Sequence, residues 1–351
     1  MILIFSQSAM EPTTEEVMDW LEALGARSLR LNGEDLDGGA VSFRLDGPEV
    51  TLRLDATTVA GAEPAAKTVA LPLAEVGAVW FRRWLQERRH EMVSLLDGPS
   101  AEDHQLHHGL RRHLTLESRK LGDFLFSRLA DRPWLSHPRR ASLNKLDVLI
   151  RAAQAGFATP GTLVTTERDE LRRFCLDCCG TAGAVITKPI GEVDMFIAGE
   201  RSHFIFTASL DLEAIDALPE RFAPSLFQER IEKAYELRVF YLAGELYAMA
   251  IFSQLDPQTR TDFRRYNRER PNRMVPFRLP AETAERLRLL MEDLRLETGS
   301  ADLLQARDGR IVFLEINPVG QFGMVSKPCN YHLERKVAAT LIRKELDGRG
   351  A

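Results

Sequence analysis

The sequence predicts a mixed fold, with a small α/β part at the amino terminus and a larger α+β part after it. Two observations carry this prediction. The first 81 residues alternate short apolar segments, typical of strands, with one helical pattern, whereas residues 231–351 contain hairpins and two helices. The 351 residues are enough for two or three domains with a well-buried core.

The first part begins with a strand over residues 1–6 and a helix, EEVMDWLEALG, that ends at Gly25. The segments SFRL and VTLRLD alternate apolar and polar residues on either side of Gly47-Pro48, so they predict a hairpin. We interpret residues 55–70 as a loop, and the continuous apolar run VGAVWF predicts a buried strand. This order of elements indicates a small α/β domain.

A single long helix is predicted over residues 101–130. It carries four histidines, and two of them, His104 and His108, are one turn apart, a spacing that suits a metal ion. No carboxylate-rich or cysteine motif accompanies them, so a solvated helix face is the favoured interpretation.

Composition excludes several classes of protein. The net charge of −5 does not indicate a nucleic-acid-binding protein, and no apolar run reaches the roughly 18 residues of a membrane-spanning helix. Few cysteines and no signal peptide predict a reducing, cytoplasmic location.

Three of the four cysteines form a CxxCC cluster at the end of a predicted helix: Cys175, Cys178 and Cys179. A zinc site usually needs four nitrogen or sulfur ligands at a recognisable spacing, and Cys329 is distant in the sequence. A buried, reduced structural role is therefore favoured over a metal or redox role.

The proline- and charge-rich segment DRPWLSHPRR is interpreted as a linker. A helix capped by Ser142 and ended by Gly156 follows it. Next come a strand (TLVT), a helix (ERDELRRFCLDCC) and a strand (AVITK). The last part is predicted to contain a long loop, a helix over 281–297, a hairpin and a helix over 330–346.

The hairpin ADLLQARDGRIVFLEINP carries the strongest functional signal. Asp308-Gly309 predicts a two-residue turn, because both positions tolerate a positive φ. This turn would place Arg307 opposite Arg310, and Asp302 opposite Glu315. Asn317, two residues beyond Glu315, would point to the same face of the sheet. The candidate metal ligands are therefore Asp302, Glu315 and Asn317.

Two carboxylates directly opposite each other on a sheet repel, so a cation is expected between them. Oxygen ligands favour a hard ion, and Mg²⁺ typically takes one or two carboxylates together with substrate phosphates. The alternative is that both carboxylates lie in water at frayed strand ends. Apolar residues on both faces of the two strands disfavour that alternative.

Two lysines are candidate phosphate ligands. Lys145 lies in the first turns of the helix after the linker, and Lys188 ends the strand AVITK, where a cation is costly unless it is paired. Taken singly, each fits a surface lysine at least as well. The P-loop motif and the dinucleotide-binding fingerprint are both absent from the sequence.

The stretch LFQERIEKAYELRVFYL contains a second group of candidates. Gln228, Glu229 and Ile231 lie at a crossover that is suited to a base, and Glu236 is a carboxylate suited to a ribose. Arg238, on the same face, is suited to stabilising a transferring phosphoryl group. A surface ion pair between Glu236 and Arg238 is the alternative.

Seven arginines lie between Arg260 and Arg278, in a segment predicted to be a long loop. Such a loop is often functional and is suited to binding phosphates or an acidic substrate. A solvated loop is the alternative.

The order of Lys145, Lys188, QERI, ELR, DFRxxN, DLL and FLEINP resembles the ATP-grasp superfamily, in its glutamate-ligase-like branch. The segments VWFRRW, SLNKLDVLIRAAQAGFATPGT, RPNRMVPFRLP and NPVGQFGMVSKPCNYHLERKVA look like graspetide peptide maturases. These are relatives of the microviridin ligases, and the grasp-with-spasm maturases are the most similar. The resemblance spans nearly the whole chain.

The resemblance implies an ATP-grasp fold with an amino-terminal pre-ATP-grasp α/β domain over 1–130, a central subdomain over 131–228 and a carboxy-terminal subdomain over 229–351. It also implies roles for individual residues. The cofactor-binding residues would be Lys145, Lys188, Gln228, Glu229, Arg230, Ile231 and Glu236; the catalytic residues would be Arg238 and Arg264; the metal ligands would be Asp302, Glu315 and Asn317. The loop GEVDMFI, over the phosphates in the family, has one glycine where the family usually has several.

The resemblance implies a cytoplasmic ligase that uses ATP and Mg²⁺, with two ions, to form esters or amides within an acidic, Thr-rich precursor peptide. Arg82 and Arg83 are candidates for holding that peptide. A homodimer and a radical-SAM SPASM partner are also implied, and neither nucleic acid nor membrane is expected. The alternatives are a ligase that adds a free amino acid to a peptide or small carboxylate, and a non-catalytic ATP-binding regulator.

Overall fold

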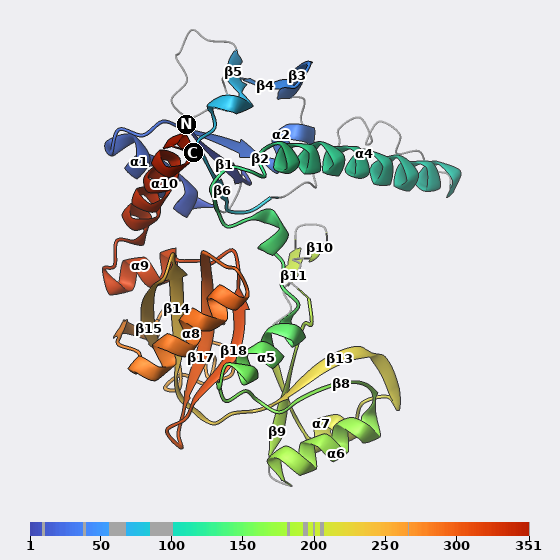
Figure 1. The fold of residues 1–351 in the computed structure, drawn as a ribbon. Coiled ribbons are helices and arrows are strands. Elements are labelled where there is room, and N and C mark those ends of the chain that lie inside the picture. Colours follow the sequence, from blue (N-terminus) through green and yellow to red (C-terminus); the bar gives the residue numbers. More distant parts are fainter. Residues whose placement is uncertain are drawn as a thin grey trace. The chain divides into compact units, whose positions relative to one another are not determined.

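The computed structural model describes residues 1–8, 11–37, 40–55, 68–84, 101–180, 183–191, 196–198, 201–203, 207–265 and 267–350. It divides into two compact units. One combines Met1–Ala141 with His332–Ala351, and the other is Ser142–Tyr331. Figure 1 shows the helices and strands of both units.

A four-stranded parallel sheet in the order β2-β1-β6-β7 forms the centre of the first unit (Figure 1). Every residue of β1 is buried, which explains why the chain begins with an apolar run. The strands are β1 (Ile2–Ser6), β2 (Ser28–Asn32), β6 (Ala78–Phe81) and β7 (Trp134–Leu135). The α/β prediction is confirmed here, although β7 lies in the segment that was interpreted as a linker.

A three-stranded antiparallel sheet, β3-β4-β5, accompanies the parallel one. Asp46 pairs with Glu49, so the predicted hairpin around Gly47-Pro48 is confirmed. The remaining elements of this unit are β3 (Val41–Asp46), β4 (Glu49–Asp55), β5 (Thr68–Pro72), η2 (Leu73–Glu75), η3 (Pro138–Arg140), α1 (Pro12–Ala23), α2 (Gly33–Asp37), α4 (Ala101–Arg128) and α10 (Leu333–Gly350).

The carboxy-terminal helix α10 belongs to the first compact unit. It packs against α1 and β6. Leu333, Val337 and Leu341 are buried at four-residue spacing, so they form one apolar stripe along the helix. Burial of this stripe explains why α10 groups with the first unit, whereas the domain bounds inferred from the sequence stay a prediction.

The second unit contains two antiparallel sheets and a small hairpin of β10 (Phe196–Ala198) and β11 (Arg201–His203). The first sheet has the order β12-β9-β13-β8 and packs against α6 and α7 through Leu171, Val185, Ile215 and Phe227. Its elements are β8 (Thr162–Glu167), α6 (Arg168–Cys179), β9 (Ala184–Lys188), β12 (Ala208–Asp211), α7 (Leu212–Asp216) and β13 (Arg221–Glu229).

The second sheet has the order β16-β15-β14-β17-β18. The helices α5 and α8 pack on one of its faces, and α9 packs against β14, β15 and β16 (Figure 1). The elements are α5 (Lys145–Gln154), β14 (Lys233–Leu242), β15 (Glu245–Phe252), β16 (Arg273–Phe277), α8 (Ala281–Asp293), β17 (Thr298–Ala306), β18 (Ile311–Asn317) and α9 (Gly323–Cys329).

Alternation along β14 and β17 separates the core of this unit from its polar face. Leu237, Val239 and Leu303 join the core under α5 and α8. Because neighbouring residues of a strand point to opposite faces, Arg238 and Asp302 lie on the other face. That face carries the candidate site.

Two local predictions for the second unit need correction. The helix α5 begins at Lys145, and its cap is Asn144 and not the predicted Ser142. Oδ1 of Asn144 accepts hydrogen bonds from the backbone N–H groups of Leu146 and Asp147. The segment predicted to be a long loop ends in the strand β16. This strand lies at the sheet edge, where Pro276, which has no backbone N–H, is tolerated.

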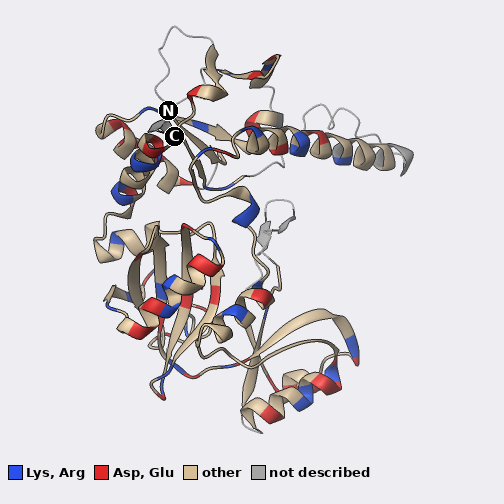
Figure 2. Ribbon diagram, viewed as in Figure 1, with Lys and Arg blue, Asp and Glu red and all other residues tan. Residues whose placement is uncertain are grey.

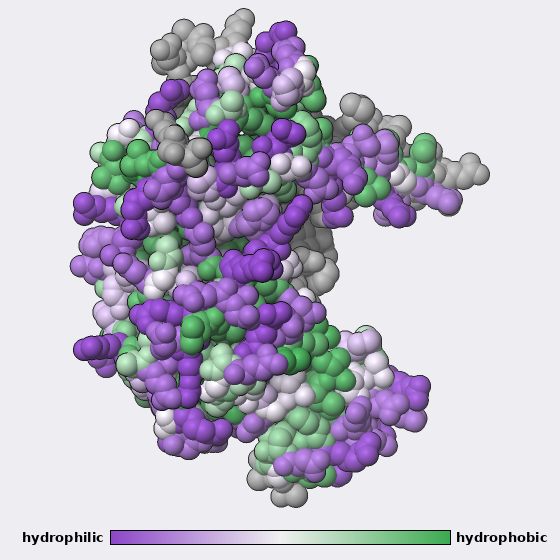
Figure 3. Space-filling model, in the orientation of Figure 1, coloured by the Kyte–Doolittle hydropathy of each residue, from purple (hydrophilic) through white to green (hydrophobic). Residues whose placement is uncertain are grey.

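The surface is ordinary for a globular protein. In Figure 2, Lys and Arg are interspersed with Asp and Glu along α6 and α8. On the face drawn in Figure 3, hydrophilic residues predominate and apolar residues are scattered among them. Among the described helices, none is both long and apolar enough to cross a membrane.

Two glycines with positive φ provide a test of packing in the second unit. A Cβ on Gly320 (φ +65°) would lie 3.0 Å from the Phe240 ring and 3.1 Å from Cα of Gly299, whereas a Cβ on Gly309 (φ +91°) would meet nothing within 4 Å. We expect Gly320→Ala to lower the free energy of unfolding by about 2–3 kcal/mol, and Gly309→Ala by about 1 kcal/mol. Equal losses in urea unfolding would contradict the packing at Gly320.

Candidate functional site

A cavity of about 530 Å³ is bounded by both sheets of the second unit. This volume suits a small-molecule ligand. Eleven of the twelve predicted site residues line it: Lys145, Lys188, Gln228, Glu229, Arg230, Ile231, Glu236, Arg238, Arg264, Asp302 and Glu315. Asn317 does not belong to the lining. The structure therefore brings together residues that are up to 170 positions apart in the sequence.

The hairpin of β17 and β18 places Asp302 opposite Glu315, as predicted. The predicted two-residue turn is nevertheless wrong. Ala306 pairs with Arg310 through its backbone N–H, and the N–H of Gly309 donates to the carbonyl of Ala306, so the loop has three residues. Gly309 adopts a φ of +91°, as expected in a three-residue turn that ends in a glycine bulge.

A second irregularity restores the pairing of the carboxylates. Leu303 pairs with Phe313, while Asp302 pairs with Glu315, so Leu314 is an extra residue on β18. The bulge moves the register by one residue and cancels the longer turn. Arg307 is consequently not opposite Arg310; its N–H donates to the carbonyl of Glu232 instead.

Each carboxylate of this pair has its own cationic partner. Arg238 Nη1 lies 2.9 Å from both oxygens of Asp302. Lys188 Nζ lies 3.3 Å, and Lys145 Nζ 3.9 Å, from Oε2 of Glu315. These cations offset the repulsion between the two opposed carboxylates.

The two carboxylates titrate differently, because their surroundings differ. Burial raises the pKa of Asp302, and the nearby Glu315 adds to this effect, although Arg238 opposes it. Burial also raises the pKa of Glu315, but Lys188 and Lys145 outweigh it, so its net pKa lies below the usual range. Glu315 is therefore anionic and ready to accept a cation.

Asn317 lies beyond the pair, and its side chain is engaged locally. Its Oδ1 accepts hydrogen bonds from the backbone of Val319 at 3.1 Å and Gly320 at 3.3 Å, in the turn after β18. An amide oxygen has two lone pairs, so this use alone does not exclude a metal. Its predicted role as a metal ligand stays a prediction.

The lining of the cavity also contains an unpartnered acceptor. Gln228 is fully buried, and its Nε2 donates to Oγ1 of Thr162 at 3.0 Å. Its Oε1 is also buried and has no hydrogen-bond partner among the described residues. A buried polar atom without a partner is rare, and it suits a ligand that brings a donor.

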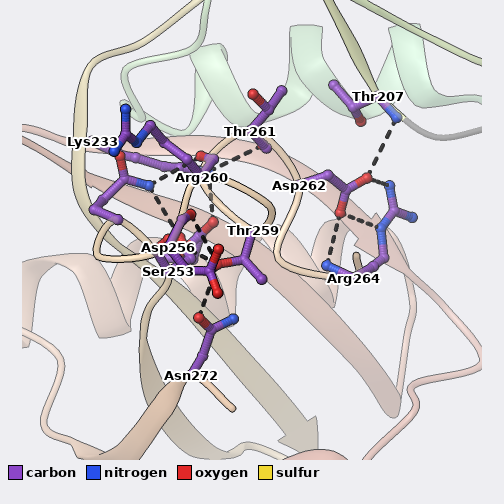
Figure 4. Close-up of polar contacts among 12 residues, drawn as sticks. Thr207, Lys233, Ser253, Asp256, Thr259, Arg260, Thr261, Asp262, Arg264 and Asn272 are labelled. Carbon is purple, nitrogen blue, oxygen red and sulfur yellow. Dashed lines mark hydrogen bonds and ion pairs between the residues drawn. The ribbon is translucent and has the colours of Figure 1, made fainter. Parts of the chain in front are cut away.

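Glu236 is held from two sides. Lys233 Nζ lies 2.6 Å from its Oε1, and the Ser253 hydroxyl donates to its Oε2 at 2.5 Å (Figure 4 shows Lys233 and Ser253). Lys233 also lines the cavity, although it was not among the residues predicted from the sequence. Its position five residues after Gln228, at the start of a strand, gave no signal beyond a solvated lysine.

Two arginines converge on the carboxylate pair. Arg238 lies beside Asp302, and its buried Nε has no hydrogen-bond partner among the described residues. The pKa of Arg264 is raised, first by its hydrogen bonds to Asp262, with smaller contributions from Glu315 and Asp302. Both guanidinium groups therefore lie within electrostatic reach of the opposed carboxylates.

The other candidates lie apart from this cavity or outside the described residues. Sγ of Cys178 and Sγ of Cys179 are 3.2 Å apart, and burial raises the pKa of Cys178 to about 12, which fits a neutral, structural thiol. No group of three or more His, Cys, Asp or Glu side chains suited to a metal is found among the described residues. The side chain of His104, and Glu192–Met195 of the predicted phosphate loop, lie outside them.

No protein-family model matches the sequence, and no curated protein matches it. Solved structures do. The macrocyclase MdnC from Microcystis aeruginosa MRC, bound with precursor peptide MdnA, is 24% identical, with a TM-score of 0.76 over 97% of this chain and 99% of that one. A Chryseobacterium gregarium RiPP-associated ATP-grasp ligase, in complex with ADP and a leader and core peptide, is 22% identical, with a TM-score of 0.75 over 98% and 96%.

The ATP-grasp ligase PsnB, complexed with a minimal precursor, Mg and ADP, is 18% identical, with a TM-score of 0.68 over 98% of this chain and 97% of that one. All three similarities span both units of the chain. The predicted fold is thus confirmed: this protein has the ATP-grasp fold, in the form found in these peptide-binding ligases.

Proposed function

We propose that this protein is an ATP-dependent ligase that activates Asp or Glu side chains of a ribosomally made precursor peptide. It then joins them to Ser or Thr hydroxyls, or to Lys amines, of the same peptide. The observation that carries the proposal is the cavity in which the opposed carboxylates Asp302 and Glu315 are surrounded by cations. The four cations are Lys145, Lys188, Arg238 and Arg264.

The unpartnered Oε1 of Gln228 supports a nucleobase at one end of the cavity. Adenine carries an exocyclic amine that can donate to such an acceptor. We assign Glu229–Ile231, which continue the same wall, to the adenine as well. Glu236, fixed by Lys233 and Ser253, is assigned to the ribose hydroxyls.

The carboxylate pair supports a magnesium site at the other end. Mg²⁺ prefers oxygen ligands, and when bound it neutralises phosphate oxygens. Asp302 and Glu315 supply the oxygens, with Asn317 as a third candidate; the number of ions, two by resemblance, is a prediction. Lys145 and Lys188, which contact Glu315 in the structure, are then available to the phosphates.

The proposed reaction has two displacements. A peptide carboxylate attacks the γ-phosphorus of ATP and ADP leaves; the hydroxyl or amine then attacks the acyl carbon and inorganic phosphate leaves. Arg238 and Arg264 stabilise the negative charge on the transferred group in both steps. The acyl-phosphate must be kept from water, which would otherwise hydrolyse it.

The peptide substrate is supported by the likeness to three ligases that are solved with precursor peptides. Arginines of the segment after β15 also reach the cavity, where they suit an acidic peptide: Arg260 and Arg264. Of the two arginines suggested for holding the peptide, Arg82 is buried against Glu11, whereas Arg83 is 30% exposed and stays a candidate. A homodimer, a radical-SAM SPASM partner and a cytoplasmic location stay predictions from the sequence.

Co-expression with neighbouring small acidic peptides tests the proposal by mass spectrometry. We expect the peptide to lose one water for each ring that forms, because condensation joins two of its own side chains. A gain in mass would instead indicate addition of a free amino acid. An unchanged mass with every candidate peptide, together with no ADP release, would favour a non-catalytic ATP-binding protein.

Removal of one carboxylate tests the metal assignment. We expect Glu315→Ala to reduce ADP release by at least about 10²-fold, because the phosphates lose metal neutralisation. The fold should survive, because this carboxylate is not part of the hydrophobic core. Circular dichroism and Tm check the fold, and wild-type ADP release by the variant would remove the assignment.

Substitution of the buried amide tests the base assignment. We expect Gln228→Leu to raise the KM for ATP about tenfold with little change in kcat, because the lost contact is to a part of ATP that does not react. Thr162→Val removes the other partner of the amide and serves as the control, with a smaller effect on KM. A lowered kcat with an unchanged KM would count against the assignment.

A further inference from the structure

We infer that Asp262 is a positioning residue for Arg264: its buried carboxylate holds one edge of the guanidinium group and so keeps this cation in the cavity that Asp302 and Glu315 also line. This inference rests on the proposed function, since it gives Arg264 a task in phosphoryl transfer. Asp262 itself carried no role in the sequence analysis, although it begins the segment DFR.

The contact between the two residues is bidentate (Figure 4). Arg264 Nε lies 2.9 Å from Oδ1 of Asp262, and its Nη2 lies 2.7 Å from Oδ2. The backbone N–H of Arg264 also donates to Oδ1, at 3.0 Å. Two parallel hydrogen bonds fix the plane of a guanidinium group, which a single contact cannot do.

Burial of Asp262 makes this arrangement firm. The Asp262 side chain is 4% exposed, whereas that of Arg264 is 44% exposed. The carboxylate is therefore the fixed partner, and the exposed part of the guanidinium group remains available to a ligand. The N–H of Thr207 also approaches Oδ2 of Asp262, at 3.4 Å, from the segment that leads into β12.

The backbone around Asp262 is held by contacts that do not involve Arg264 (Figure 4). The buried Thr259 hydroxyl lies 2.9 Å from the carbonyl oxygen of Ser253 and 3.0 Å from Oδ1 of Asn272. Lys233 Nζ donates to the carbonyl of Thr261, at 3.2 Å. The loop thus has a defined shape before any ligand binds, and Asp262 transmits this shape to Arg264.

The same chain contains a matched pair outside the cavity. Asp308 and Arg310 have the same two-residue spacing, and Asp308 accepts from both the backbone N–H and the side chain of Arg310. Both side chains are more than half exposed, in the turn between β17 and β18. Asp308→Asn therefore removes the same kind of contact without touching the candidate site.

The test compares Asp262→Asn with Asp308→Asn in the full-length protein. We expect Asp262→Asn to lower kcat about 10- to 100-fold, because a cation displaced by about 1 Å loses much of its catalytic effect. The KM for ATP should change less than about threefold, because the adenine end is untouched. Asp308→Asn should match the wild type in both.

A binding measurement gives a readout that does not need turnover. Calorimetry measures the affinities of the protein for Mg-ADP and for Mg-AMPPNP, and hence their ratio. Arg264 is expected to affect this ratio, because only AMPPNP carries the terminal phosphate that Arg264 would contact. We expect Asp262→Asn and Arg264→Ala to shift this ratio in the same direction. Asp262→Asn combined with Arg264→Ala should be no worse than Arg264→Ala alone, because the two residues act as one unit.

The outcomes separate the positioning role from the proposed function. If the wild type is active and Asp262→Asn has an unchanged kcat, the positioning role alone is overturned. The same holds if the losses of the two single variants add up in the double variant. A wild type that binds neither nucleotide would overturn both. If a Tm measurement shows that Asp262→Asn is unfolded, Asp262→Glu takes its place. This variant keeps the charge but shifts the carboxylate, so its loss of kcat should be smaller than the loss expected for Asp262→Asn.

Discussion

The opposed carboxylates of Asp302 and Glu315 are the constraint on which the second unit depends. Like charges at this spacing repel, and burial makes the repulsion stronger. The protein balances them with a cation on each side, Arg238 for one carboxylate and Lys188 with Lys145 for the other. These cations come from separate elements, so charge balance ties α5, β9 and β14 to one hairpin.

The same balance fits the function proposed above. Lys145 and Lys188 contact Glu315 in the structure, and under the proposal a divalent ion would take their place at this carboxylate. The two lysines would then be available to phosphate oxygens. Preorganised charge of this kind is the usual source of catalysis in phosphoryl transfer.

Sequence reasoning predicted the pairing of the carboxylates but not the path of the chain between them. Asp-Gly predicts a tight turn, and alternation predicts which side chains share a face. Neither reveals that the loop has a third residue or that Leu314 is bulged, since both depend on how the two strands twist against their neighbours. The longer loop and the bulge each shift the register by one residue, in opposite senses. Asp302 therefore still pairs with Glu315, although the predicted turn was wrong.

Residues held by long-range contacts were harder to predict. Lys233 begins β14 and Asp262 lies in the loop after β15, and one partner of each, Thr261 and Thr207 respectively, becomes a neighbour only in the folded chain. The apolar stripe of α10 is visible in the sequence, but its partner is not. By its sequence pattern alone, this helix could belong to either unit. Its packing against α1 and β6 places it in the first unit.

That packing makes the first unit discontinuous, with the second unit inserted between residues 141 and 332. The insert is continuous in sequence, so during synthesis on the ribosome it can fold as soon as it has emerged. The parallel sheet, although made first, lacks the helix that covers β6 until the last turns of α10 are translated. The apolar surface that α10 covers is then exposed while the whole second unit is translated, and this unit is the one expected to depend on chaperones.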